Sequence, residues 1–98
     1  MNREDIVARL RENEQALRAR GVAHAAVFGS RARGDAGPDS DTDIMIETDP
    51  AARIGVFEYV ALKEYIASLF DGPVDVVNRN ALKPYVRPAA TADTIYAF

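Results

Sequence analysis

The sequence predicts a small α/β (α+β) protein, in which helices pack on a mixed sheet of three to four strands. Segments with apolar residues at helical spacing alternate along the chain with short, nearly continuous apolar segments that are typical of strands. The chain has 98 residues, of which 48% are hydrophobic and 28% charged. A chain of this size and composition can bury one core, so we expect a single domain over residues 1–98.

The first segment, from Arg3 to about Arg20, is expected to form a helix. Asn2 can cap its start and Gly21 can end it. Charged residues cover the other faces, and one stripe is apolar: Ile6, Val7, Leu10 and Leu17.

Four segments are expected to be strands. Residues Val22 to Phe28 are nearly all apolar and end at a glycine, which predicts a buried central strand. Thr42 to Glu47 alternates between apolar and polar residues, and Val74 to Asn78 is a third short apolar run. The last five residues, TIYAF, are expected to add an edge strand.

Two further helices are expected. Asp49 can cap a helix with Pro50 at its first position. Asn80 and Pro84 are expected to open a last helix that Pro88 cuts short. The apolar pattern of the helix after Pro50 consists of Phe57, Ala61, Leu62, Tyr65, Ile66 and Leu69.

Composition argues against several classes of protein. The 12 basic and 15 acidic residues give a net charge of −3, so we expect no extended basic surface and no direct binding of nucleic acid. The chain has no cysteine, which suits a reducing compartment. It has no apolar run typical of a signal peptide or membrane span. We therefore expect a cytoplasmic protein with no membrane association.

The stretch FGSRARGDAGPDSDTDIMIE concentrates glycines, arginines and aspartates, and a calcium loop is the first interpretation to consider. Asp39, Asp41 and Asp43 have the alternating positions of the first EF-hand ligands. That loop needs glycine at its sixth position and a bidentate glutamate at its twelfth. Ile44 and Pro50 stand there instead, which argues against calcium.

A P-loop is the second interpretation. Gly29 and Gly34 have the spacing of its two glycines. The motif then needs a lysine for the phosphates and a hydroxyl for Mg²⁺. Asp35 and Ala36 occupy those positions, and an aspartate would repel the phosphates, so this interpretation fails.

The third interpretation joins a phosphate-binding turn to a metal site. Gly29 ends a buried strand and lets a substrate approach the backbone, while Ser30 adds a hydroxyl and the free N–H groups of such a turn can bind an anion. Asp41 and Asp43 are two residues apart on a strand, so their side chains leave the same face. Two carboxylates so placed can share two Mg²⁺ ions with a nucleoside triphosphate.

The pattern Gly29-Ser30, ten residues, then Asp41-Thr42-Asp43 resembles the signature of the polymerase-beta-type nucleotidyltransferases. The stretch GSRARGDAGPDSDTDIMIE is similar to their small prokaryotic branch, the minimal nucleotidyltransferases (MNT). The resemblance covers nearly the whole chain and implies the polymerase-beta-like palm fold. Asp75, in the apolar run PVDVV, matches the third aspartate of the family.

The resemblance implies transfer of a nucleoside monophosphate, with ATP as the expected substrate, to a hydroxyl acceptor. Asp41, Asp43 and Asp75 would then bind two Mg²⁺ ions and carry the catalysis. The phosphates would be held by the turn and its arginines: Gly29, Ser30, Arg31 and Arg33.

The minimal nucleotidyltransferases that this chain resembles are usually encoded beside a HEPN-domain partner. The resemblance implies an antitoxin that forms a hetero-oligomer with a HEPN ribonuclease toxin and adds AMP to one of its tyrosine hydroxyls. Two alternatives stay open from sequence: a non-catalytic antitoxin that neutralises its toxin by covering it, and a free-standing transferase that modifies a small molecule.

Overall fold

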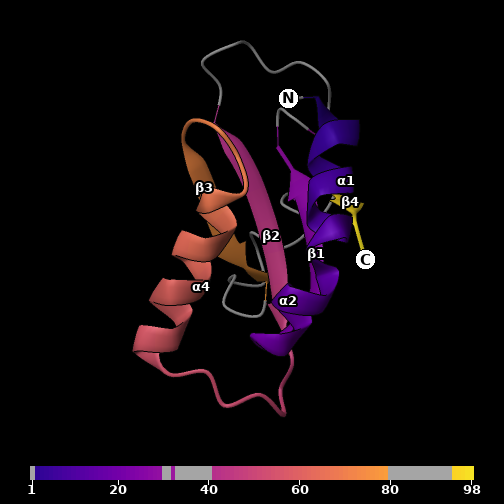
Figure 1. Ribbon diagram of the computed structural model, residues 1–98. Coiled ribbons are helices and arrows are strands. Elements are labelled where there is room, and N and C mark those ends of the chain that lie inside the picture. The colour runs from indigo at the N-terminus through magenta and orange to yellow at the C-terminus, as the bar shows by residue number, and fades with distance from the viewer. Residues whose placement is uncertain (1, 30–31, 33–40, 80–93) are drawn as a thin grey trace.

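The computed structural model describes residues 2–29, 32, 41–79 and 94–98, and it confirms the predicted class (Figure 1). One four-stranded mixed sheet has the order β3-β2-β1-β4. Strand β1 pairs antiparallel with β2 and with β4, whereas β2 and β3 are parallel. The strands are β1 (Val22–Phe28), β2 (Thr42–Thr48), β3 (Val74–Asn78) and β4 (Ile95–Tyr96). Strand β2 is one residue longer than predicted, and β4 is the predicted edge strand.

The helices of the described residues are α1 (Arg3–Glu12), α2 (Glu14–Ala19) and α4 (Val56–Ser68). The prediction of one helix from Arg3 to Arg20 is wrong, because the chain leaves helical geometry at Asn13. The Asn13 side chain donates a hydrogen bond to the carbonyl of Arg9, 2.8 Å away. Asparagine competes with the helix ladder in this way, and the helix axis breaks there.

The main core lies between the three helices and one face of the sheet (Figure 1). The strand positions alternate, so every second residue of β1 and β2 faces this layer. The residues that meet there come from helices and strands alike: Ile6, Leu10, Leu17, Ala25, Val27, Ile44, Ile46, Leu62, Ile66 and Val76. This core fixes β2 between β1 and β3.

The segment after β2 differs from its prediction. Asp49 does not cap a helix at Pro50. Its carboxylate accepts a hydrogen bond from the backbone N–H of Ala51 at 2.9 Å and closes a turn. Such Asx turns compete with helix capping, because the same side chain serves either structure. The helix begins at Val56, after Gly55, and its first turn leaves Phe57 87% exposed, so Phe57 is not the core residue that its spacing predicts.

The helix expected to open at Asn80 and end before Pro88 lies outside the described residues. No helix in the described part of the chain is long and apolar enough to cross a membrane.

Candidate functional site

Two predicted carboxylates lie side by side near one end of the sheet. Asp43 and Asp75 are each the second residue of their strand, and the parallel pairing of β2 with β3 sets them directly opposite each other. Residues in register on neighbouring strands point to the same face, with the strands about 4.8 Å apart. Asp75 is exposed and Asp43 is partly exposed. Distant segments of the chain thus bring two acids to one accessible place.

The glycine turn lies against the first of these acids. Phe28, the last residue of β1, pairs with Asp43, and Gly29 follows with a left-handed φ of +73°. A Cβ atom built on Gly29 would lie 2.4 Å from the Oδ2 atom of Asp43. Only a residue without a side chain lets the backbone and this carboxylate approach so closely.

Asp41 lies immediately before β2 and is exposed. Thr42, between Asp41 and Asp43, is only 4% exposed, and side chains alternate along an extended chain, so the two aspartates belong to the same side. Among the described residues, no three acidic or histidine side chains gather into a group able to hold a metal ion. What the sheet brings together is therefore the pair Asp43 and Asp75. Mg²⁺ commonly takes one or two protein carboxylates and completes its shell with substrate phosphates and water, which this pair can satisfy.

Ser30, Arg31 and Arg33 lie outside the described residues, so their roles stay predictions. Ala32, within the same segment, has helical backbone and is 4% exposed. It belongs to the hydrophobic core. The chain therefore returns to the core soon after the Gly29 turn.

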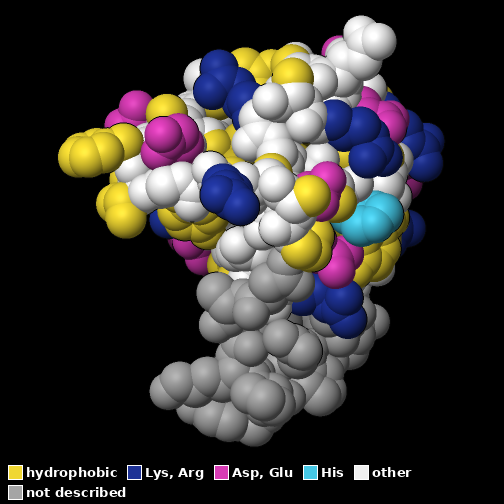
Figure 2. Space-filling model, turned by 90° about the horizontal axis from the view of Figure 1, so that it is seen from below, with side chains coloured by type: hydrophobic (Ala, Val, Ile, Leu, Met, Phe, Trp, Pro, Cys, Tyr) yellow, Lys and Arg dark blue, Asp and Glu magenta, His cyan; other side chains and the backbone are white. Residues whose placement is uncertain are grey.

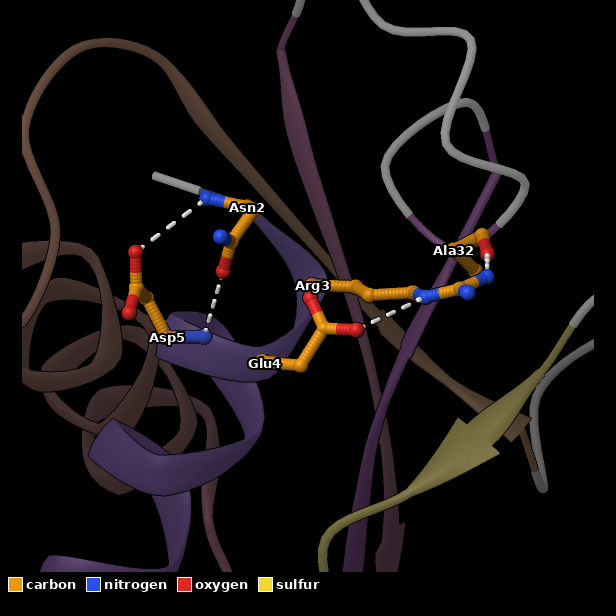
Figure 3. Close-up of polar contacts among 5 residues, drawn as sticks. All are labelled: Asn2, Arg3, Glu4, Asp5 and Ala32. Carbon is orange, nitrogen blue, oxygen red and sulfur yellow. Dashed lines mark hydrogen bonds and ion pairs between the residues drawn. The ribbon is translucent and has the colours of Figure 1, made fainter.

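A contact from α1 reaches Ala32, and no pattern in the sequence predicts it. The guanidinium of Arg3 donates a hydrogen bond to the carbonyl of Ala32 at 3.0 Å and pairs with Glu4 at 3.3 Å (Figure 3). Arg3 is itself held by a capping box at the start of α1, in which Asn2 accepts from the N–H of Asp5 at 2.9 Å. A backbone hydrogen bond and the neighbouring Arg3 lower the pKa of Glu4.

The charge of Asp75 also acts across the sheet. Burial raises the pKa of the Tyr59 hydroxyl on α4, and the negative charge of Asp75 raises it further. Tyr59 packs against the core on the helical side. The carboxylate of Asp75 thus disfavours a second negative charge at Tyr59 on α4.

A pair of carboxylates on neighbouring strands beside a glycine turn is an arrangement that suits a divalent metal ion and a phosphate-bearing substrate. The comparison with known families makes the class specific, since the model of the nucleotidyltransferase domain matches residues 6–97. The chain belongs to this family, and it is a nucleotidyltransferase of the minimal type that its motif predicts.

Relatives and solved structures agree with this assignment. The chain is 32% identical to the protein adenylyltransferase MntA of Thermococcus cleftensis, over 95% of this chain and 93% of that protein. A solved structure described as a minimal nucleotidyltransferase is 28% identical, with a TM-score of 0.77 over 97% of this chain and 95% of the other. A toxin–antitoxin structure with AMP-PNP is 21% identical, with a TM-score of 0.68 over 100% of this chain and 73% of the other, and it supports the fold alone.

Proposed function

We propose that this chain is a cytoplasmic antitoxin that transfers AMP from ATP to a tyrosine hydroxyl of a partner HEPN ribonuclease toxin and so neutralises it. The Thermococcus cleftensis relative, named as a protein adenylyltransferase, aligns with the chain over nearly its whole length. One chain of a toxin–antitoxin structure solved with AMP-PNP has the same fold. The observation that carries the proposal is the register of Asp43 with Asp75 beside the Gly29 turn.

In the proposed reaction the tyrosine oxygen attacks the α-phosphorus of ATP. The bond from that phosphorus to the oxygen bridging to the β-phosphate breaks, and pyrophosphate leaves. Asp75, on the exposed edge strand β3, accepts the proton of the hydroxyl. Asp41 and Asp43 would hold the metal ions beside the nucleotide. Two Mg²⁺ ions held by these aspartates and the phosphates would supply the positive charge that the triphosphate and the attacking oxygen need.

The glycine turn holds the β- and γ-phosphates of the nucleotide. Gly29 allows the phosphates to approach the backbone, and Ser30 donates its hydroxyl to the β- or γ-phosphate. Arg31 and Arg33 neutralise the pyrophosphate as it leaves. The turn and the aspartates then bind the two ends of the triphosphate, which aligns the α-phosphorus with the acceptor.

The test uses radiolabelled ATP, Mg²⁺ and the purified product of the neighbouring gene, which we expect to be the HEPN toxin. We expect label on the toxin with the wild-type chain and at least about 100-fold slower labelling with Asp43→Asn or Asp75→Asn. Asp71→Asn is the matched control, because it makes the same charge change at an exposed turn before β3. Unchanged labelling by the site variants would refute their assigned roles.

The same variants separate the two alternatives. An Asp43→Asn chain that still neutralises the toxin fully in cells would show that covering the toxin is sufficient. Transfer of label to a small molecule in the absence of any protein acceptor would show a free-standing transferase.

A further inference from the structure

The first two turns of α4 carry an apolar surface that the fold does not use. We call this surface the α4 knob, and it consists of Val56, Phe57 and Val60, which are 78%, 87% and 48% exposed. They are three of the four large hydrophobic residues exposed in the described part of the chain. Hydrophobic side chains project from the molecule on the side where α4 begins (Figure 2).

The knob is separate from the face of α4 that packs on the sheet. Leu62 and Ile66 are buried in the core. With about 100° of rotation per residue, Phe57 points away from both. Further along the outer side, the exposed Lys63 and Glu64 interrupt the apolar surface. Folding therefore explains the buried face of α4 and leaves the knob unexplained, and a localised exposed apolar patch marks a contact site.

Grooves lie on both sides of the knob. One has a volume of about 430 Å³ and is lined by the side chains of Arg18, Arg20 and Arg53. The other has a volume of about 490 Å³, and Ile54 and Tyr59 contribute apolar and aromatic lining. A projecting knob between two hollows offers a partner a shape to enclose as well as an apolar anchor.

The first of these grooves contains two guanidinium groups, those of Arg20 and Arg53, that have no carboxylate partner in the described part of the chain. Arg18 is already paired with Glu14 at 2.7 Å. The Arg20 guanidinium stacks on the ring of Tyr65, 4.4 Å from its centroid, and has no carboxylate partner among the described residues. The exposed Arg53 side chain likewise makes no ion pair within the described part of the chain.

Two carboxylates, those of Asp49 and Glu58, also line this groove. The carboxylate of Glu58 folds back over the start of its own helix, since a Cβ on Gly55 would lie 2.5 Å from its Oε2 atom. Asp49 accepts the N–H of Ala51. Beside these two acids, the groove still offers a partner the guanidinium groups of Arg20 and Arg53, although the whole chain carries a net charge of −3.

We infer that the α4 knob is the docking surface for the protein acceptor, and that the acceptor encloses Phe57 in an apolar pocket with carboxylates at its rim facing Arg20 and Arg53. This inference rests on the proposed function. A second copy of the chain is a poorer occupant, because a two-fold contact through the knob would bring the arginines of one copy toward those of the other.

The knob lies far from the chemistry. Thr48, at the end of β2, lines the groove beside the knob, and Asp43 lies five residues earlier along the strand, about 16 Å away. A partner held at the knob leaves the aspartates accessible, so its acceptor tyrosine comes from another part of its surface. The knob thus raises the local concentration of acceptor without touching the reacting atoms.

The experiment measures binding of the purified HEPN toxin by calorimetry. We expect Phe57→Ser to raise the dissociation constant by about 10- to 100-fold, as for loss of an aromatic anchor at the centre of an interface. Arg53→Glu should weaken it as well, and most strongly at low salt. Glu64→Ser is the matched control, since it changes an exposed residue of the same helix and should bind as the wild type does.

Kinetics give a second measurement. With Phe57→Ser, KM for the toxin should rise with the loss of affinity, while kcat at saturating toxin and KM for ATP stay at the wild-type values. The inference is overturned if Phe57→Ser binds the toxin with wild-type affinity. It is also overturned if the wild-type chain self-associates in the ultracentrifuge and Phe57→Ser does not, because the knob would then be a contact between copies of the chain. If Phe57→Ser loses binding but the wild-type chain transfers no label, docking is upheld and the proposed function fails.

Discussion

Replacing Gly29 with alanine should damage the site far more than the fold. The residue has a φ of +73°, where an L-amino acid with a Cβ costs about 1 to 2 kcal/mol. In a chain of this size, that loss lowers the midpoint of thermal unfolding by roughly 5 to 15 °C. The protein should therefore stay folded at room temperature, with its stability reduced.

The effect on activity follows from the contact with Asp43. The added Cβ would lie 2.4 Å from Oδ2, and real Cβ atoms essentially never approach a neighbouring heavy atom closer than 3.0 Å. The carboxylate must therefore move by more than half an ångström or the turn must open. A displacement of about 1 Å at a reacting group can cost 10²-fold in rate, so we expect AMP transfer to fall by about that factor.

Gly72→Ala provides the matched control. Gly72 has a φ of +77°, nearly the same backbone penalty, but a Cβ there meets no atom within 4 Å. Initial rates with labelled ATP and thermal unfolding by circular dichroism should show similar losses of stability in both variants, with a loss of rate in Gly29→Ala alone. If Gly29→Ala keeps the wild-type rate, or Gly72→Ala loses as much, the close approach to Asp43 has no part in the reaction.

Two further predictions concern the surroundings of the site. Arg3→Met removes the hydrogen bond to the Ala32 carbonyl, so it should lower the free energy of unfolding by about 1 kcal/mol and raise KM for ATP. Arg11→Met is the control, because it loses a similar hydrogen bond to the Ala97 carbonyl. It should lower the free energy of unfolding without changing KM for ATP. Because the pKa of Tyr59 is raised above 10.0, its stabilising effect is complete below pH 10 and is lost as pH rises through the folded-state value. The free energy of unfolding, measured with denaturant, should therefore fall less steeply above pH 10 in Tyr59→Phe than in the wild type. Equal slopes would contradict a raised pKa for Tyr59.

Local patterns were sufficient to predict the strands of the sheet. The segments Val22–Phe28 and Val74–Asn78 were predicted with the bounds that the structure has. The first is a continuous apolar run, as a buried strand requires, and both are short apolar-rich segments next to turn formers. The capping role of Asn2 was also correct, since it depends on neighbouring residues alone.

Errors arose where one residue can serve two structures. Asn13 can continue a helix or bond back to the preceding turn, and Asp49 can cap a helix or close a turn; each takes the second course. Phe57 has the spacing of a core residue, but spacing does not say which side of a helix meets the sheet when both sides are partly apolar. Tertiary packing decides these cases.

The candidate site was predictable in its residue types and only partly in its geometry. Spacing places Asp41 and Asp43 on one side of a strand, whereas no pattern within a segment gives the register of one strand on another. The pairing of Asp43 with Asp75 depends on β2 and β3 being parallel neighbours. From the sequence alone, Asp75 could be proposed only through resemblance to a family. The strand pairing shows that it lies beside Asp43.

The chain segment that connects β2 to β3 also determines where a protein acceptor can dock. Parallel neighbours need a crossover, and here α4 carries the chain from the far end of β2 back to the start of β3 (Figure 1). The first turns of α4 must therefore lie near Thr48 and Asn78, at the end of the sheet away from the aspartates. An apolar residue exposed at the start of this crossover is necessarily remote from the carboxylates. A partner that encloses Phe57 must therefore extend past the edge strand β3 to bring a hydroxyl to Asp75.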